Sequence, residues 1–414
     1  MKASVLVKAL LLALLPLSFA LSAQAQVRMA EFLGAAAQDP TLEVYSKKLE
    51  HLHHKPYRLA PLRDLEFRFK NNELYKGEHD YGLRLSLANP WHLKSNSRYF
   101  KAYQSVLTAE QGLAMKEVLE ARYTLVLELA FVSEQITVKQ KLLANLQNQV
   151  KILENQRSSS FFDESDYVKL RLELLEEQTS LEGLQYELEK QKNVVHQLYP
   201  STGLQENNWT FSNMVPPQRL HQLLDSLLTL PLYTARLGYY QERLKLAGSE
   251  YDLQRTKVNP GFIQTDYQPS NGKHPYGLSA GIRIPLFNPN KGDMTEKKLE
   301  MIEVRNELEL EEQKAREEIE HLQKSLKGNL LRYQTLEEKE STYDLKSMFS
   351  ALSELNRKNP IISLKMNAQL LKLQSLKVQQ KRDIYQSYLQ FLVAADLLHQ
   401  RPLVNYFSPV LEPL

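Results

Sequence analysis

The chain has 414 residues, with 52 Lys or Arg and 49 Asp or Glu, so its formal net charge is only +3. A balance this close to neutral gives no reason to expect a nucleic-acid partner, whose phosphates attract a surplus of cations. The sequence contains no cysteine, which excludes disulfides, thiolate metal sites, thiol catalysis and a lipid anchor on a cysteine.

Residues 1–25 have the pattern of an export signal. Lys2 and Lys8 precede an apolar run from Ala9 to Leu21, and a small-x-small site ends at Ala25. The apolar run is too short to span a bilayer, and its position after two cations is typical of a signal peptide. We expect cleavage after Ala25 and export of the remainder; a buried N-terminal helix is the alternative.

The rest of the chain shows signs of an internal repeat. Three landmarks recur in order: a proline in a short helical segment, the phrase Tyr-Gly-Leu before another proline, and a charged non-helical break. The phrase begins at Tyr81 and again at Tyr276. Landmarks that recur in one order indicate duplication of an ancestral half. We therefore expect a signal peptide at 1–25, a first repeat at 26–200, a linker at 201–225, a second repeat at 226–402 and a tail at 403–414.

Each half contains two segments in which apolar and polar residues alternate. They begin at Leu65 (LEFRFK) and Gly82 (GLRLSL) in the first half, and at Gly261 (GFIQTDYQP) and Gly277 (GLSAGIRI) in the second. Alternation with a period of two predicts half-buried strands, and the turn-rich linkers between them predict one hairpin in each half. Four strands are too few to close a barrel within one chain. They would form a small soluble sheet, or several chains would pool their strands.

A long helical hairpin follows each pair of strands. Residues 91–199 contain no proline, and their apolar residues recur at heptad-type spacing. Breaks at 157–164 and 356–360 divide each run into two antiparallel arms, and Asp163 or Ser165 would cap the returning helix. An arm of about 55 residues would reach roughly 80 Å, far longer than a globular core requires. The fold is therefore expected to be mainly α with a small β part.

These features resemble the TolC-type outer membrane efflux protein family across essentially the whole mature length. The family's strand that enters the second hairpin reads Gly-Leu, six residues, Pro-Leu-Phe and a turn with glycine, as in YGLSAGIRIPLFNPNKG at Tyr276. The first half keeps Gly82, Leu83 and Pro90 but has Trp91 where the family has a branched aliphatic residue. By resemblance, the swivel from strand to helix comprises Gly82, Pro90, Gly277, Pro285, Phe287 and Gly292.

The resemblance implies a homotrimer in the outer membrane. Each protomer would give four strands to one β-barrel that continues into a periplasmic α-barrel of long helices. Apolar strand residues would face the lipid. Aromatic residues near the strand ends would lie at the membrane interfaces, namely Tyr81, Trp91, Tyr267, Tyr276 and Phe287. The residues that would face the lumen are Arg84, Ser86, Ser279 and Arg283.

The same resemblance implies an exit duct for efflux or type I-like secretion, which works with a periplasmic adaptor protein and an inner-membrane pump. The hairpin tips would form the periplasmic entrance. The first tip departs from the family pattern, because Ser158, Ser159 and Ser160 stand where a glycine is usual. The residues expected at the entrance are Arg157, Asp163, Asp166, Arg357, Asn359, Pro360 and Lys365.

No pattern in the sequence supports catalysis, a metal site or a cofactor. The histidines in HLHH at 51–54 lack an acidic partner at ligand spacing, and no phosphate-binding loop or nucleophile elbow occurs. The alternative function is a non-transporting periplasmic coiled-coil adaptor or tether. An adaptor would need a lipoyl-like domain, which we do not find, and a tether would not need lipid-facing alternation in its strands.

Overall fold

The computed structural model describes residues 29–54, 59–71, 79–158, 162–200, 209–227, 234–258, 261–268, 273–282, 289–342 and 360–414. The segment interpreted as a signal peptide lies outside the described residues. None of the helices within the described ranges has a stretch long and apolar enough to cross a membrane.

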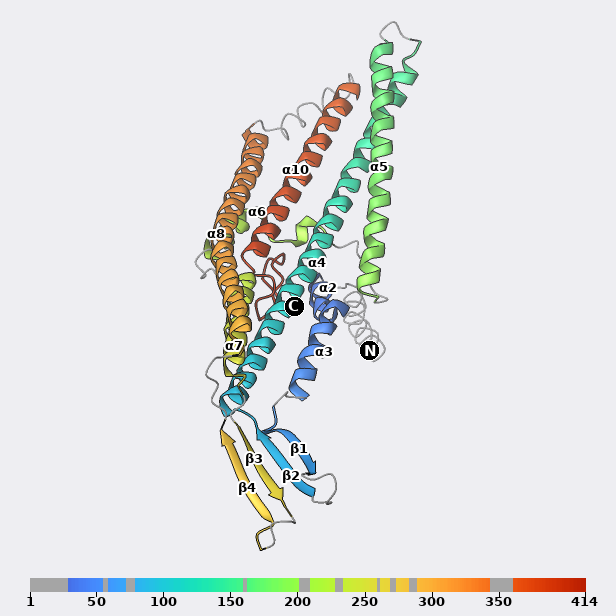
Figure 1. The fold of residues 1–414 in the computed structure, drawn as a ribbon. Helices are drawn as coiled ribbons and strands as arrows, with labels where there is room; N and C mark the ends of the chain where they lie inside the picture. Colours follow the sequence, from blue (N-terminus) through green and yellow to red (C-terminus); the bar gives the residue numbers. More distant parts are fainter. Residues whose placement is uncertain are drawn as a thin grey trace, which may run out of the picture. The chain divides into compact units, whose positions relative to one another are not determined.

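The structure is mostly helical, with one small sheet (Figure 1). The predicted order, in which two strands precede two long helices, occurs in both halves of the chain. Descent of the halves from one ancestor stays a prediction. The elements in chain order are α2 (Met29–Gly34), η1 (Ala35–Gln38), α3 (Pro40–His54), β1 (Leu62–Asn71), β2 (His79–Leu87), α4 (Pro90–Asn155), α5 (Glu164–Leu198), η3 (Phe211–Asn213), α6 (Pro217–Leu227), α7 (Ala235–Thr256), β3 (Gly261–Tyr267), β4 (Tyr276–Ile282), α8 (Lys291–Thr342) and α10 (Pro360–Ala394).

The chain divides into two compact units. The strand unit comprises Pro40–Ala114 and Tyr233–Arg316, and it holds the whole sheet. The hairpin unit comprises Met1–Asp39, Met115–Leu232 and Glu317–Leu414. Helices α4 and α8 contribute residues to both units, and we describe each unit by itself.

The sheet of the strand unit is antiparallel throughout, with the strands in the order β1-β2-β3-β4 (Figure 1). Pairing of β2 with β3 joins the two halves of the sequence. Gly261, at the start of β3, has a φ of +147°, and a Cβ atom there would lie 2.0 Å from the carbonyl oxygen of Gly281. Only glycine permits this backbone approach, so β3 and β4 can pair up to their ends.

Helices α4 and α5 meet at the predicted break at 157–164, and α10 begins at the end of the break predicted at 356–360, whereas α8 is described only as far as Thr342. Pro90 and Pro360 are the first residues of α4 and α10, a position that needs no backbone N–H. The Asp163 side chain accepts a hydrogen bond of 3.1 Å from the N–H of Asp166, so Asp163, rather than Ser165, caps α5.

The heptad pattern in the second part of α4 is confirmed by burial. Leu143, Leu146, Val150 and Leu153 are all buried. Leu146, Val150 and Leu153 belong to a core that also contains Leu170 of α5 and residues of α10. This core holds α4 and α5, the first helical hairpin, against α10, the helix that follows the second break.

The main core of the hairpin unit also contains residues of the segments predicted as a linker and a tail. Trp209, Phe211 and Val215, in the predicted linker, are buried, and α6 runs across the predicted boundary at 225. The C-terminal tail joins the same core through Phe407. The tail is fixed by Tyr123 of α4, whose hydroxyl donates to the carbonyl of Val404 at 3.1 Å and accepts from the N–H of Tyr406 at 3.0 Å.

Candidate functional site

The sheet of the strand unit separates its side chains into an apolar and a polar face. Residues paired across an antiparallel sheet point to the same side, so the register assigns each side chain to a face. The apolar face is exposed, with accessible fractions of 67% for Phe67, 77% for Leu278 and 85% for Ile282. The register places on it Leu65, Phe67, Phe69, Tyr81, Leu83, Leu85, Leu87, Ile263, Thr265, Tyr267, Tyr276, Leu278, Ala280 and Ile282, with Asn71 and His79 beyond them at the turn.

The opposite face carries charges of both signs. Arg68 lies 3.1 Å from Glu66, and the amide of Gln264 donates to Asp266 at 2.6 Å. The register places on this face Asp64, Glu66, Arg68, Lys70, Asp80, Gly82, Arg84, Ser86, Phe262, Gln264, Asp266, Gly277, Ser279 and Gly281. Three of the four residues expected to face a lumen, Arg84, Ser86 and Ser279, share this face, and Arg283 lies outside the described residues.

Phe262 is an aromatic residue on the polar face, and two neighbours explain its place. Its ring lies beside Gly281, where a Cβ atom would be only 2.5 Å from the ring. The guanidinium of Arg84 lies over the ring, 3.5 Å from its centroid. The cation therefore covers an apolar surface that would otherwise interrupt the polar face.

The expected swivel residues fall into two places. Gly82 and Gly277 lie on the polar face on either side of Asp266, and a Cβ atom at Gly82 would lie 2.9 Å from its carboxylate. Pro90 and Gly292 lie in the first turns of α4 and α8. Pro285 and Phe287 are outside the described residues.

Aromatic side chains form a row across all four strands near the turn end of the sheet. Phe69, Tyr81, Tyr267 and Tyr276 are successive cross-strand partners. The ring centroids of Phe69 and Tyr81 are 5.6 Å apart, and those of Tyr267 and Tyr276 are 5.1 Å apart. Trp91 lies beyond the other end of β2 and is 70% exposed. Aromatic residues thus lie near both ends of β2, Tyr81 at the turn end and Trp91 just after the other end.

The hairpin unit brings together two of the residues expected at an entrance. The Nζ atom of Lys365, in α10, lies 2.8 Å from Oδ2 of Asp166, in the first turn of α5. This contact holds the pKa of Asp166 below its ordinary value, because the ammonium donates to the carboxylate and attracts its charge. Arg157 lies in the turn after α4, whereas Arg357 and Asn359 lie outside the described residues.

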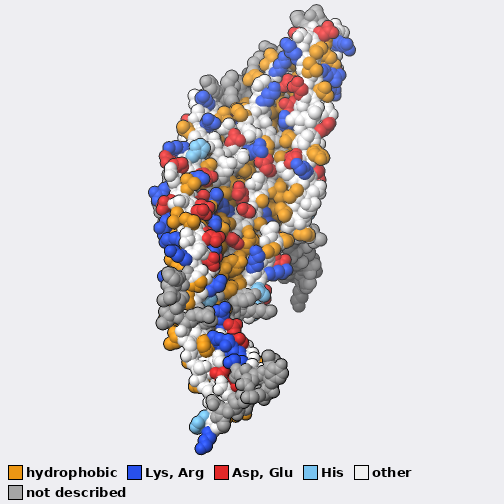
Figure 2. All heavy atoms as spheres, viewed as in Figure 1, with side chains coloured by type: hydrophobic (Ala, Val, Ile, Leu, Met, Phe, Trp, Pro, Cys, Tyr) orange, Lys and Arg blue, Asp and Glu red, His pale blue; other side chains and the backbone are white. Residues whose placement is uncertain are grey.

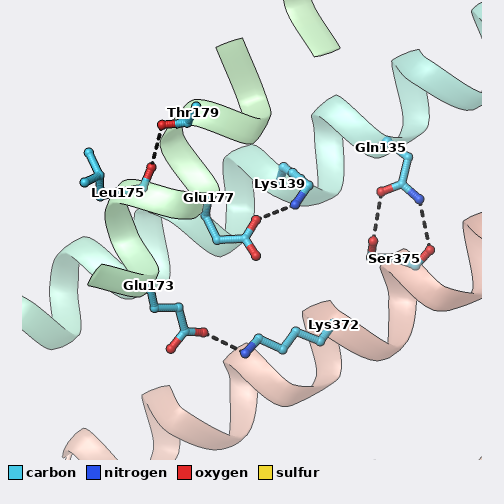
Figure 3. A network of polar contacts seen from close by, with 8 residues as sticks. All are labelled: Gln135, Lys139, Glu173, Leu175, Glu177, Thr179, Lys372 and Ser375. Atoms are coloured by element: carbon cyan, nitrogen blue, oxygen red, sulfur yellow. Dashed lines mark hydrogen bonds and ion pairs between the residues drawn. The ribbon is translucent and has the colours of Figure 1, made fainter. Parts of the chain in front are cut away.

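Further polar pairs continue this contact along the helices (Figure 3). Lys372 of α10 lies 2.6 Å from Glu173 of α5, one heptad after Lys365 and Asp166. Gln135 of α4 donates to the backbone carbonyl of Ser375 at 3.0 Å and accepts from its hydroxyl at 2.8 Å. Sequence reasoning missed these residues, although the heptad spacing from Asp166 and Lys365 was available as a signal.

The helices otherwise carry a mixed surface. Figure 2 shows acidic and basic side chains interspersed over the face in view, with apolar side chains between them. Within the described part of the chain, no group of three or more His, Asp or Glu side chains is arranged to hold a metal ion.

No protein-family model matches the sequence, and no curated protein matches it. Solved structures match its fold over nearly the whole chain. The outer membrane protein VceC from Vibrio cholerae aligns with a TM-score of 0.63 and 15% identity, over 89% of this chain and 96% of that one. A membrane protein from Pseudomonas aeruginosa aligns with a TM-score of 0.65 and 12% identity, over 90% of each chain.

The CmeC outer membrane channel from Campylobacter jejuni aligns with a TM-score of 0.62 and 13% identity, over 92% of this chain and 86% of that one. Identities this low show a common fold. The protein therefore has the fold of the TolC-family outer membrane channels.

Proposed function

We propose that the protein is the outer-membrane exit duct of a tripartite efflux or type I-like secretion system. The observation that carries this proposal is the separation of the sheet into an exposed apolar face and a charged face. A soluble sheet would cover its apolar face with another element of the chain, whereas a channel wall needs one face for lipid and one for water.

The strand length suits this role. β1 has ten residues, which at about 3.3 Å each make roughly 30 Å. A strand tilted by roughly 40° then spans about 25 Å, the height of the apolar band in outer-membrane barrels. The aromatic row at one end and Trp91 at the other match the positions of interfacial aromatic girdles.

The sheet must be completed by other copies of the chain. Each of its edge strands, β1 and β4, has a single partner within the sheet. Free edges are unfavourable in lipid, because unpaired backbone groups find no water there. Three copies of this four-stranded sheet bring twelve strands, and a closed barrel of them would have a polar lumen that includes Arg84, Ser86 and Ser279.

The long helices would assemble in the same homotrimer as a periplasmic α-barrel. Helix α5 offers a surface for this packing, since Val168, Leu172, Leu175 and Tyr186 are exposed. The starts of α5 and α10, joined by Asp166 and Lys365, would then surround the periplasmic entrance, where a periplasmic adaptor protein bound to an inner-membrane pump would meet the duct. Transport through the duct would be passive, and the protein would not be an enzyme.

The test is planar-bilayer conductance of the detergent-purified protein, together with its mass in the same detergent. A trimer that gives discrete conductance steps supports the duct. A monomer without conductance contradicts it and favours a periplasmic coiled-coil tether. Washing of membranes distinguishes a duct from a tether in a second way. A duct stays in outer membranes at high salt and in carbonate, whereas a tether is released.

A further inference from the structure

A cavity of about 360 Å³ lies in the strand unit where β1 and β2 meet the helices. Its polar lining includes Arg63, His92 and Lys257, and its apolar lining includes Leu59, Leu62 and Leu87. No acidic side chain is among the described residues that line it. The volume is in the lower part of the range for small-molecule sites.

The walls of the cavity are held by hydrogen bonds between elements that are distant in sequence. The N–H of Ala88 donates to the carbonyl of Pro61 at 2.9 Å, which ties the end of β2 to the start of β1. The side-chain amide of Asn89 donates to the carbonyl of Thr256 at 2.8 Å, which ties the same segment to the end of α7. The ring of His92 lies 3.3 Å from the Thr256 hydroxyl. The cavity is therefore built before any ligand arrives.

A β-bulge places one of the cations. The register of β1 against β2 shifts between Leu62 and Asp64, so Arg63 is an extra residue without a cross-strand partner. Bulges change the direction of a side chain relative to the regular alternation. Arg63 thus lines the cavity instead of following the face pattern of the strand. Its contact with Asp64 at 3.5 Å joins two side chains that are each 60% exposed, and such pairs are weak.

The two cations that line the cavity affect the pKa of His92, which lines it as well. Burial lowers the pKa of His92 first, and the charges of Lys257 and Arg63 lower it further, against a hydrogen bond to the backbone of Leu253 that raises it. His92 is therefore a neutral donor or acceptor at neutral pH, beside two cations. A singly charged anion with several oxygen atoms complements this set of groups.

The apolar side of the cavity distinguishes a lipid from a soluble anion. Leu62 and Leu87 are cross-strand partners at the end of β1 and β2, and Leu87 continues the exposed apolar face of the sheet. Leu59 is also exposed beside them. An acyl chain leaving the cavity would meet apolar surface, whereas a free phosphate would leave these leucines in contact with water.

We propose that this cavity binds the headgroup of an anionic phospholipid at the periplasmic side of the outer membrane. The phosphate would lie between Arg63 and Lys257, with His92 hydrogen-bonded to it, and the acyl chains would lie along the apolar face. The proposal rests on the proposed function, because it requires the sheet to lie in a membrane. Basic pockets at membrane interfaces bind phospholipid headgroups by this combination of charge and apolar contact.

The test is native mass spectrometry of the purified full-length protein titrated with phosphatidylglycerol. Parallel titrations use phosphatidylcholine and soluble glycerol phosphate. The test variant is Arg63→Gln with Lys257→Gln, and the matched control is Arg68→Gln with Lys70→Gln, which removes the same charge from the polar face of β1. We expect the test variant to bind phosphatidylglycerol roughly tenfold or more weakly than the wild type, and the control to bind it unchanged.

Three outcomes would overturn the proposal: equal loss in both variants, no preference for phosphatidylglycerol over phosphatidylcholine, or glycerol phosphate competing as well as the lipid. Outer-membrane fractionation and conductance of the same variants distinguish failure of the lipid-binding proposal from failure of the proposed duct function. A conducting outer-membrane protein without headgroup preference refutes only the cavity. A protein absent from outer membranes refutes the duct.

Discussion

Lys365 and Asp166 form an ion pair of 2.8 Å that joins the start of α10 to the start of α5. One heptad further, Lys372 and Glu173 repeat the same contact between the same helices. The returning helices of the two hairpins, α5 and α10, are therefore linked side by side near their starts. If the starts of these helices surround the entrance of a duct, the first pair restrains how far the entrance can open.

If the protein is the proposed duct, replacing Asp166 by Asn should increase the time that it spends in a high-conductance state. The change removes the charge that holds Lys365, and the next link lies a full heptad away. Stability should change by less than about 1 kcal/mol, because both side chains of the pair are about half exposed. Single-channel recording measures the first effect, and thermal unfolding measures the second.

The control for Asp166→Asn is Lys324→Gln. Lys324 pairs with Glu320 within α8, so its loss removes an exposed ion pair without separating two helices. Its conductance should equal that of the wild type. Equal effects of the two variants would mean that the conductance responds to surface charge in general.

Acid should reproduce the effect of Asp166→Asn. The pKa of Asp166 is lowered by its hydrogen bond and charge interaction with Lys365, so the pair stabilises the joined state above the unfolded pKa of about 4. That stabilisation is lost as the pH falls through the lower folded pKa. Wild-type conductance should therefore rise between about pH 5 and pH 3, and Asp166→Asn should lack this part of the change. The same rise in both proteins would assign it to other groups.

The two neighbouring residues Leu278 and Ser279 of β4 test the faces of the sheet. Leu278→Arg places a charge on the apolar face and should weaken folding into lipid vesicles by about 2–4 kcal/mol if it lies near the bilayer centre. Ser279→Arg, one residue later on the polar face, should cost little. The readout is the fraction of protein that resists urea extraction from vesicles. Similar losses in both variants would contradict a lipid-facing role for the apolar face.

Tyr123 and Tyr388 are both buried in the hairpin unit. The Tyr123 hydroxyl is hydrogen-bonded to the tail, whereas the Tyr388 hydroxyl has no hydrogen-bond partner among the described residues. Tyr123→Phe should lower stability by about 1–3 kcal/mol, because the buried N–H of Tyr406 loses its acceptor. Tyr388→Phe should be neutral or stabilising, since its hydroxyl has no hydrogen-bond partner among the described residues. Thermal unfolding of the two variants in one detergent measures the difference, and equal losses would show that Tyr123 does not hold the tail by this contact.

Local patterns in the sequence predict the elements well. Alternation at Leu65 to Lys70 locates a strand, although β1 extends beyond it at both ends, and the proline at 360 locates the start of α10. Asp163 is one of two possible caps in the sequence, and only the backbone geometry selects it. These features depend on a few adjacent residues, which is why they can be read without the fold.

Contacts between residues that are distant in the sequence could not be predicted from it. Pairing of Arg84 with Gln264 depends on which strands become neighbours, and alternation does not determine that. Trp209 and Phe211 lie in a segment without a clear period, so their burial in the core follows from tertiary packing alone. The cavity depends on the bulge at Arg63. The alternating run that predicts the strand begins only at Leu65, so it does not indicate the bulge.

An exposed apolar stripe runs along α5 and is suited to contact with a second copy of the chain. At 100° per residue, Val168, Leu172, Leu175 and Tyr186 lie on one side of the helix, nearly opposite the buried residues Leu170 and Val195. Within one chain this stripe remains in contact with water. A second copy of the chain would bury it, and Tyr186, which is 74% exposed, would contribute the largest side chain.

Leu172→Glu with Leu175→Glu should therefore convert the proposed trimer to a monomer in detergent. The matched control is Gln178→Glu with Gln185→Glu, which adds the same charge to exposed positions beside the stripe. Mass measured by light scattering during size-exclusion chromatography distinguishes the states. Because the stripe is not part of the sheet, a variant that stays trimeric would place the assembly contacts in the strands alone. Loss of the trimer in the control as well would show that added charge, rather than the lost leucines, separates the subunits.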